Sequence, residues 1–182
     1  MEYVDAHKKA QEIFRDVLKD VSEHHLDLPT PCSEWTVRDV IDHVIRGNYR
    51  VSGETDVSFG EDPVGLKHAF SSSATLAHSV FSLEDGLNVT YTLPIGEVPG
   101  AIFIRLRTSD VFVHAWDLAS AMSKSTDLDS DLAQLLLENA KNFLSESLRG
   151  EGRPFAMEKI APEGSNDTDR LCAFLGRDIR IG

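Results

Sequence analysis

Apolar residues recur three or four positions apart in five stretches of this chain, which is the spacing of an amphipathic helix. The pattern predicts helices over residues 4–25, 36–50, 63–81, 100–122 and from about 127 to 150. Pro29 and Pro31 separate the first two of these helices, because the interior of a helix does not accommodate proline. Thr36 and Asp39 have the spacing of a capping box and therefore mark where the second helix begins.

Two further segments depart from this helical pattern. Over residues 88–100, Val89, Tyr91 and Leu93 alternate with polar residues, which predicts a short strand or an irregular hairpin. Residues 151–182 are expected to form a tail that packs back on the body and contains a short helix ended by Gly176. We therefore predict an all-α fold, with a helical bundle over residues 1–150 that includes a short β-hairpin excursion.

Composition and charge narrow the classes of function. A chain of 182 residues can bury a full core without disulfides, and its two cysteines, Cys32 and Cys172, lie far apart. The net charge of −12 repels nucleic acid and anionic lipid, so we expect neither as a partner. No segment reads as a signal peptide or a membrane span, and we expect a cytoplasmic protein. The sequence leaves open whether the chain forms a homodimer.

The fourth predicted helix carries three polar side chains on its apolar face. Asp110 and His114 lie one turn apart, and Asp117 follows three residues later. An ionised carboxylate in an apolar core is unfavourable unless an arginine, a polar network or a metal cation pairs with it. His43 flanks the apolar stripe of the second helix and could reach the same interior. His43, Asp110 and His114 would offer three ligands and leave a coordination position open, as in catalytic zinc sites.

Two interpretations of this cluster stay open at this point. In the first, His43, Asp110 and His114 hold a metal, and Asp117 orients His114 from outside the ligand set. In the second, the bundle is free of metal and Arg107 pairs with Asp110.

The remaining candidate side chains are expected to have structural roles. We expect three histidines on the surface, namely His7, His68 and His78, and we interpret His24 and His25 as structural residues near a helix end. Cys32 is expected to be a small buried hydrophobe in its proline-rich loop rather than a nucleophile.

Three strings of the sequence resemble motifs of one family. Residues 28–44 (LPTPCSEWTVRDVIDHV) are similar to the opening motif of the actinobacterial mycothiol-dependent maleylpyruvate isomerase N-terminal-like proteins, within the DinB/YfiT-like superfamily. Residues 110–119 (DVFVHAWDLA) resemble the second motif of these proteins. Residues 169–178 (DRLCAFLGRD) resemble the tail of an uncharacterised branch, so the resemblance runs nearly from end to end.

The resemblance implies a DinB-like four-helix bundle that holds a divalent metal, zinc or nickel, on His43, Asp110 and His114. It also implies that mycothiol or a similar small thiol is a cosubstrate, which the metal activates as a thiolate for attack on an electrophile. The isomerase carries Glu where this chain has Asp110, and it has a further C-terminal domain. The resemblance therefore favours a thiol-dependent transferase or isomerase over maleylpyruvate isomerisation itself. The alternative is a non-catalytic metal-binding or stress-related protein.

Overall fold

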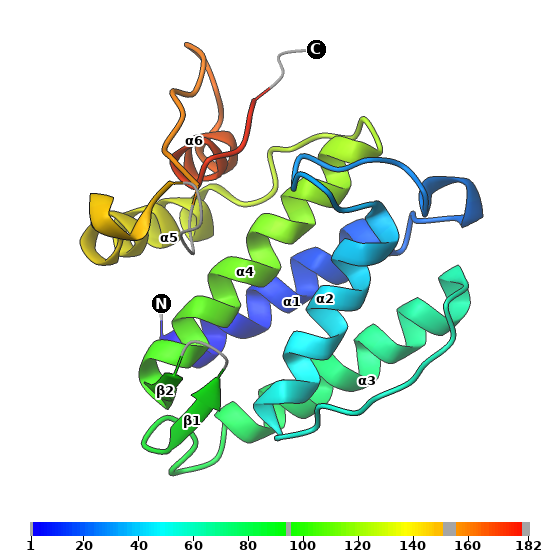
Figure 1. Ribbon diagram of the computed structural model, residues 1–182, viewed down its shortest axis with the longest axis vertical. Helices are drawn as coiled ribbons and strands as arrows, with labels where there is room; N and C mark the ends of the chain where they lie inside the picture. Colours follow the sequence, from blue (N-terminus) through cyan, green and yellow to red (C-terminus); the bar gives the residue numbers. More distant parts are fainter. Residues whose placement is uncertain (1, 94–95, 151–155, 180–182) are drawn as a thin grey trace.

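The computed structural model describes residues 2–93, 96–150 and 156–179, and this part of the chain is mostly helical (Figure 1). It contains six α-helices, two short strands and two 3-10 turns. In chain order these elements are α1 (Tyr3–Leu18), η1 (Glu23–His25), α2 (Val37–Val51), α3 (Pro63–Phe81), β1 (Thr90–Leu93), β2 (Gly96–Pro99), α4 (Gly100–Ala121), α5 (Ser130–Phe143), η2 (Glu146–Leu148) and α6 (Asp167–Phe174). The predicted all-α fold with a small hairpin is confirmed.

Helices α1 to α4 enclose the main hydrophobic core. α1 packs along α4, and α2 packs along α3 (Figure 1). The core is dense with aromatic and branched side chains, and the rings of Phe14 and Phe70 meet there with centroids 4.8 Å apart. Full burial of one such side chain contributes about 1.5–3 kcal/mol. β1 and β2 pair antiparallel beside the start of α4, where they cover a second, smaller cluster.

The loop before α2 is held by its own hydrogen bonds, which fixes the side chains that precede the helix. The Thr30 hydroxyl donates to the carbonyl of Trp35 at 2.9 Å and to that of Cys32 at 3.2 Å. The predicted capping box is present: the Thr36 hydroxyl accepts from the Asp39 backbone N–H, and the Asp39 carboxylate accepts from the Thr36 N–H. The start of α2 is therefore rigid, and Cys32 and Trp35 have defined positions beside it.

Several sequence-based expectations need correction. The first helix ends at Leu18, and residues 23–25 form a separate 3-10 turn, in which the Ser22 N–H donates to Nδ1 of His25 and the His25 N–H donates to the Ser22 carbonyl. The fifth helix ends at Phe143 rather than near residue 150, and its carboxyl end is followed by the separate turn η2. His7, expected on the surface, is fully buried because it lies on the same face of α1 as Ala10 and Phe14. His78 is half-buried, whereas His68 is exposed as expected.

The C-terminal segment packs on the bundle through α5 and α6. α6 contacts α5, and the indole N–H of Trp116 on α4 donates to Asp169 of α6 at 2.7 Å. Gly176 follows α6 with a φ of +95°, which agrees with the predicted end of the helix. Residues 151–155 lie outside the described residues, so a division between 150 and 151 stays a prediction. Within the described residues, every helix is too short or too polar to cross a membrane.

Candidate metal centre

The fold brings His43 of α2 together with Asp110 and His114 of α4. Nε2 of His43 lies 3.2 Å from both carboxylate oxygens of Asp110, and Nε2 of His114 lies 3.5 Å from Oδ1 of Asp110. One donor atom from each residue lies within 4.8 Å of the others. Helical periodicity explains the Asp110–His114 pair, because residues four apart share one helix face. The predicted three side chains are therefore gathered at one place.

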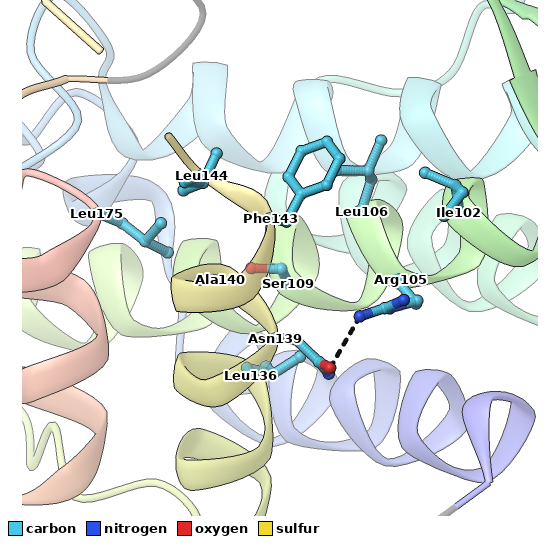
Figure 2. A pocket seen from close by; sticks show the side chains of 10 residues that line it. All are labelled: Ile102, Arg105, Leu106, Ser109, Leu136, Asn139, Ala140, Phe143, Leu144 and Leu175. Atoms are coloured by element: carbon cyan, nitrogen blue, oxygen red, sulfur yellow. Dashed lines mark hydrogen bonds between the residues drawn. The ribbon is translucent and has the colours of Figure 1, made fainter. Parts of the chain in front are cut away.

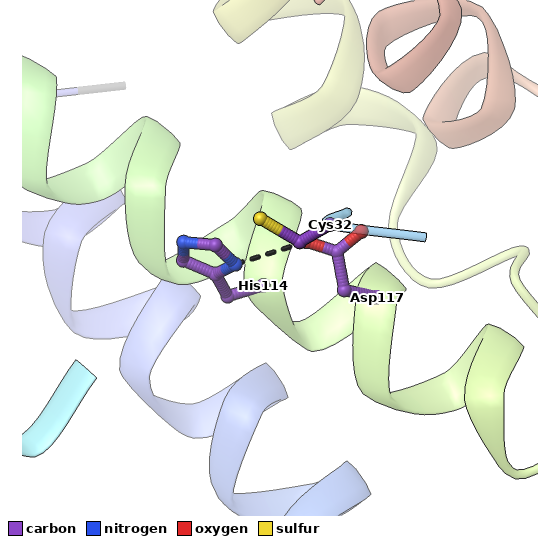
Figure 3. A group of neighbouring side chains, drawn as sticks. All are labelled: Cys32, His114 and Asp117. Carbon is purple, nitrogen blue, oxygen red and sulfur yellow. Dashed lines mark hydrogen bonds and ion pairs between the residues drawn. The ribbon is translucent and has the colours of Figure 1, made fainter. Parts of the chain in front are cut away.

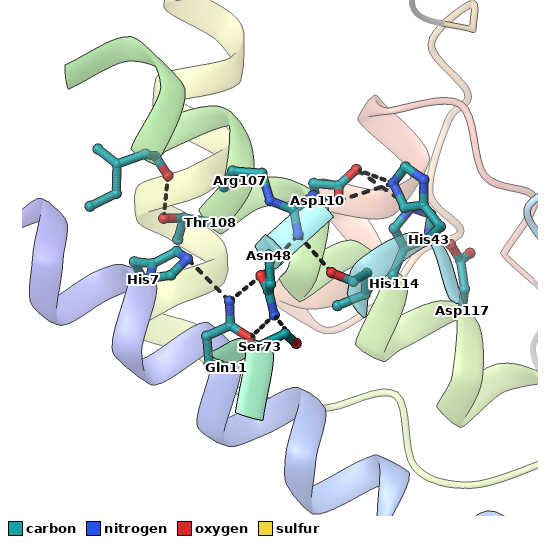
Figure 4. Close-up of polar contacts among 12 residues, drawn as sticks. His7, Gln11, His43, Asn48, Ser73, Arg107, Thr108, Asp110, His114 and Asp117 are labelled. Atoms are coloured by element: carbon teal, nitrogen blue, oxygen red, sulfur yellow. Dashed lines mark hydrogen bonds and ion pairs between the residues drawn. The ribbon is translucent and has the colours of Figure 1, made fainter. Parts of the chain in front are cut away.

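Arg107 contacts the same carboxylate from inside the bundle (Figure 4). Its Nη1 donates to Oδ2 of Asp110 at 2.6 Å, while Nη2 donates to the carbonyl of Val44 and to Oδ1 of Asn48. Burial alone would raise the pKa of Asp110, but Arg107 and then His114 outweigh it and hold that pKa well below its usual range. The arginine pairing considered from the sequence is therefore present, and it coexists with the histidine cluster.

A buried polar network supports Arg107 from behind (Figure 4). Asn48 exchanges two hydrogen bonds with Gln11 of α1, at 2.8 and 3.0 Å, and the Gln11 amide also contacts Nε2 of His7 at 3.1 Å. All of these side chains are buried. Gly47, one turn after His43, leaves the space that the Arg107 guanidinium fills, because a Cβ there would lie 2.3 Å from Nη1.

His114 is fixed by a second carboxylate. Its Nδ1 lies 2.9 Å from Oδ2 of Asp117, which is fully buried. Arg177 then holds Asp117 with two hydrogen bonds of 3.0 Å, from Nε to Oδ1 and from Nη2 to Oδ2. With Nδ1 donating to Asp117, Nε2 faces Asp110 and is the nitrogen that a metal would bind after displacing its proton. Burial lowers the pKa of His114, but Asp110 and Asp117 outweigh it and raise the value to about 9.

The three grouped side chains face a cleft. Its cavity volume is about 370 Å³, and Trp35 and Arg177 stand in its wall with the grouped residues. The Trp35 ring lies 4.7 Å from the His43 ring and 5.6 Å from the His114 ring, measured between centroids. The side chains of His43 and Asp110 are 35% and 31% exposed, whereas that of His114 is 6% exposed. A small molecule in the cleft would therefore reach the donor atoms.

A second group of donor atoms, from Cys32, His114 and Asp117, lies beside the first (Figure 3). Both oxygens of Asp117 already accept from Arg177, and one of them also contacts Nδ1 of His114. Burial raises the pKa of the Cys32 thiol, which disfavours the thiolate that a metal needs. This group is therefore a poorer ligand set. Cys32 is half-buried and lines the cleft, rather than being wholly enclosed as expected.

In the first group, the two separations that involve Asp110 are compatible with a divalent metal. Ligand atoms about 2.0–2.1 Å from a tetrahedral zinc ion lie about 3.4 Å from one another. The separations between Asp110 and the two histidines are 3.2 and 3.5 Å. Two imidazoles and one carboxylate suit zinc or nickel, and the cleft leaves room for a further ligand. His43, Asp110 and His114 could therefore hold such a cation.

Sequence reasoning missed several residues of this arrangement. Arg177 lies 60 positions from Asp117, so only the resemblance of residues 169–178 to a family motif drew attention to its segment. Trp35 was noted only as part of the string that resembles the opening motif of the family. Asn48 and Gly47 gave no signal, although a glycine inside a helix is a hint of a close approach by another group. Asp117 and Arg107 both contact the predicted ligands as expected.

Comparisons with known proteins identify the family and a structure with a similar fold. The family model described as the mycothiol maleylpyruvate isomerase N-terminal domain matches residues 7–80. Two uncharacterized proteins, from two strains of Mycobacterium tuberculosis, are 44% identical over 182 residues, which is 99% of this chain and 100% of each relative. A crystal structure of a mutant of the mycothiol-dependent maleylpyruvate isomerase aligns with a TM-score of 0.59 and 16% identity, covering 83% of this chain and 73% of that one. At that identity, the last likeness shows the fold.

Proposed function

We propose that this chain, which belongs to the mycothiol maleylpyruvate isomerase N-terminal domain family, binds a divalent cation on His43, Asp110 and His114 and catalyses a thiol-dependent reaction. The observation that carries the proposal is the convergence of three donor atoms within 4.8 Å of one another beside an open cleft. Their separations suit zinc or nickel, and zinc is the first expectation.

A bound divalent cation would supply Lewis acidity, which lowers the pKa of a thiol and provides a nucleophile at neutral pH. The residues of this chain have the remaining tasks. Arg107 keeps Asp110 ionised and holds Oδ2, while Oδ1 lies near both imidazoles. Asp117 and Arg177 hold His114 in the tautomer whose Nε2 faces the cleft. Trp35 covers both imidazoles on one side and limits the access of water to them.

The thiol proposed for this cleft is mycothiol or a similar small thiol, because the family and its structural neighbour bear that name. The second substrate is an electrophile, and the reaction is an S-transfer or an isomerisation. A non-catalytic metal-binding or stress-related protein remains the second candidate. It is favoured by the same donor atoms, since nothing in their geometry requires turnover.

Elemental analysis of the purified protein tests the metal site. We expect one zinc or nickel ion per chain after supply of the metal, and its loss in the variant His43→Ala. His43 is partly exposed, so its removal should leave the fold intact. His68→Ala is the matched control, because His68 is an exposed histidine away from the cleft. Substoichiometric metal that does not respond to His43→Ala would favour the metal-free bundle, in which Arg107 alone pairs with Asp110.

A conjugation assay then separates an enzyme from a binder. Mycothiol and 1-chloro-2,4-dinitrobenzene are mixed with the metal-loaded protein, and thioether formation with release of chloride is followed. A rate well above that of the thiol alone, lost in His43→Ala and retained in His68→Ala, supports catalysis. Metal-loaded protein that never exceeds the rate of the thiol alone would assign the site to the non-catalytic alternative.

A further inference from the structure

A narrow apolar slot, called here the α4–α5 slot, lies between those two helices (Figure 2). Ile102 and Leu106 of α4 form one wall. Leu136, Ala140 and Phe143 of α5 form the other, with Leu144 just beyond the end of that helix. α5 packs chiefly on α6 rather than along α4, which leaves the slot open.

The slot adjoins the cleft of the candidate metal centre. Leu106, Ser109 and Leu175 line both spaces. Ser109 directly precedes Asp110, so the wall that the two spaces share lies beside a proposed metal ligand. At a rise of about 1.5 Å per residue, Ile102 lies about 12 Å along α4 from Asp110. A ligand with its reactive atom near His114 could therefore extend a chain into the slot.

The chemistry of the slot favours a slim apolar group. Its one cationic side chain among the lining residues, Arg105, is engaged with Asn139 through a hydrogen bond of 2.9 Å (Figure 2). Phe143 is 48% exposed, so part of its aromatic ring is in contact with solvent at the edge of the slot. The cavity volume of the slot is about 70 Å³. A cavity of about 150 Å³ accommodates benzene, so the slot suits an alkyl chain of a few carbons better than a ring.

We propose that the electrophilic cosubstrate of this protein carries an unbranched alkyl chain, which lies in the α4–α5 slot while its electrophilic carbon stands in the cleft. This inference rests on the proposed thiol-dependent function, because the cleft supplies the nucleophile. The slot would select substrates by the length of their alkyl chain. Burial of each additional methylene contributes about fourfold to affinity or to kcat/KM until the slot is filled.

A series of 2-alkenals from propenal to 2-nonenal provides suitable probes. The thiolate sulfur forms a bond to the β-carbon, the π pair moves toward the carbonyl oxygen, and the proton lost by the thiol returns to the α-carbon. The products and reactants therefore balance without an oxidant or reductant. Loss of the alkenal absorbance, corrected for the rate of the thiol alone, gives kcat/KM for each length. We expect kcat/KM to rise about fifteenfold to sixtyfold over two or three methylenes and then level off.

Variants of α5 and its end locate this effect in the slot. Ala140→Phe should fill the slot and remove most of the dependence on chain length. Leu144→Ala should move the plateau to longer chains, and it covers the case in which Ala140→Phe does not fold. Glu138→Phe is the matched control, because Glu138 is an exposed position of α5 outside the slot. Conjugation that proceeds at the same rate for all lengths, or a length dependence unchanged in both slot variants, would overturn the proposal.

Direct binding separates failure of this inference from failure of the proposed function. The protein without thiol is titrated with 1-butanol, 1-hexanol and 1-nonanol, and methyl NMR shifts of leucines are followed. Affinity that grows with length and weakens in Ala140→Phe supports the slot even if no conjugation is detected, in which case only the proposed reaction fails. Absence of such a trend, or a dimer that covers Phe143 and excludes the alcohols, would assign the slot to something other than an alkyl chain.

Discussion

Replacement of Gly47 by alanine is expected to destabilise the protein, although alanine is the better helix former. The added Cβ would lie 2.3 Å from Nη1, 2.5 Å from Cζ and 2.7 Å from Nη2 of Arg107. Contacts this short force the guanidinium to move. The tip of an arginine is usually free to do so, but here three hydrogen bonds hold it, to Asp110, Val44 and Asn48. Displacement therefore breaks or strains contacts inside the bundle.

The magnitude follows from two opposing effects. Removing glycine from a helix interior contributes about 1 kcal/mol in favour of the variant. Loss of a hydrogen bond to a charged group costs about 1.5–3 kcal/mol, and at least one is lost when the guanidinium of Arg107 shifts. For the loss of one such hydrogen bond, we expect a net decrease of about 0.5–2 kcal/mol in the free energy of unfolding. Because Arg107 also orients Asp110, metal affinity should fall about tenfold.

Urea denaturation and metal titration measure these two quantities. A double-mutant cycle with Arg107→Met supplies the control, because the clash cannot occur once the guanidinium is absent. In that background Gly47→Ala should become stabilising by about 1 kcal/mol. Gly47→Ala that stabilises the wild-type chain by the same amount and leaves metal affinity unchanged would refute the role assigned to Gly47.

Three further predictions concern other buried groups. Burial, then Arg107 and His78, lower the pKa of His7 from 6.5 to about 3, so below pH 6.5 the unfolded chain binds a proton that the folded chain does not. The free energy of unfolding should therefore decrease by up to about 1.4 kcal/mol for each unit by which the pH drops below 6.5. Urea denaturation at pH 7.5 and 5.5 should show a smaller decrease for His7→Leu than for the wild-type protein. Arg177→Met should lower metal affinity at least tenfold in titrations with zinc, whereas Arg170→Met, an exposed control, should not. Trp116→Phe should lower the denaturation free energy by about 1–3 kcal/mol, because a buried carboxylate loses the indole donor; an unchanged value would contradict that contact.

Local patterns explain what could be predicted from the sequence. The Thr36–Asp39 capping box needs only neighbouring residues, and the start of α2 was placed correctly. The same holds for Asp110 and His114, whose spacing on one helix puts them on one face whatever the surrounding fold. The position of His43 opposite them depends on how α2 meets α4. The apolar stripe of α2 suggested that His43 could reach the interior, and the family resemblance implied that it joins Asp110 and His114. The structure shows His43 in contact with Asp110.

Contacts between distant segments explain what was missed. His7 was expected on the surface because it is polar, but Gln11 and Asn48 give its ring a polar neighbour inside the bundle. The spacing of residues within one helix cannot predict these contacts, because they depend on how α1 packs beside α2. Arg177 has the same difficulty, since its partner Asp117 lies on another element and no periodicity links the two. The choice between arginine and metal at Asp110 was posed as exclusive, yet the carboxylate has two oxygens. Oδ2 accepts from Arg107 while Oδ1 faces His114, so the arginine pairing does not rule out the proposed cation.

In the salt bridge between Arg107 and Asp110, the guanidinium neutralises the buried carboxylate, so no metal is needed for that purpose. Zinc fingers fold only when metal neutralises and gathers their ligands. Because Arg107 already pairs with the Asp110 carboxylate, we expect no such dependence here: a chelator should remove the proposed cation and leave the helices folded. Binding of the proposed cation would then be a reversible step on a protein that is already folded. The cation recovered with a preparation would reflect which ions the medium supplied and their relative affinities for imidazole and carboxylate, and reconstitution with each metal in turn becomes practicable.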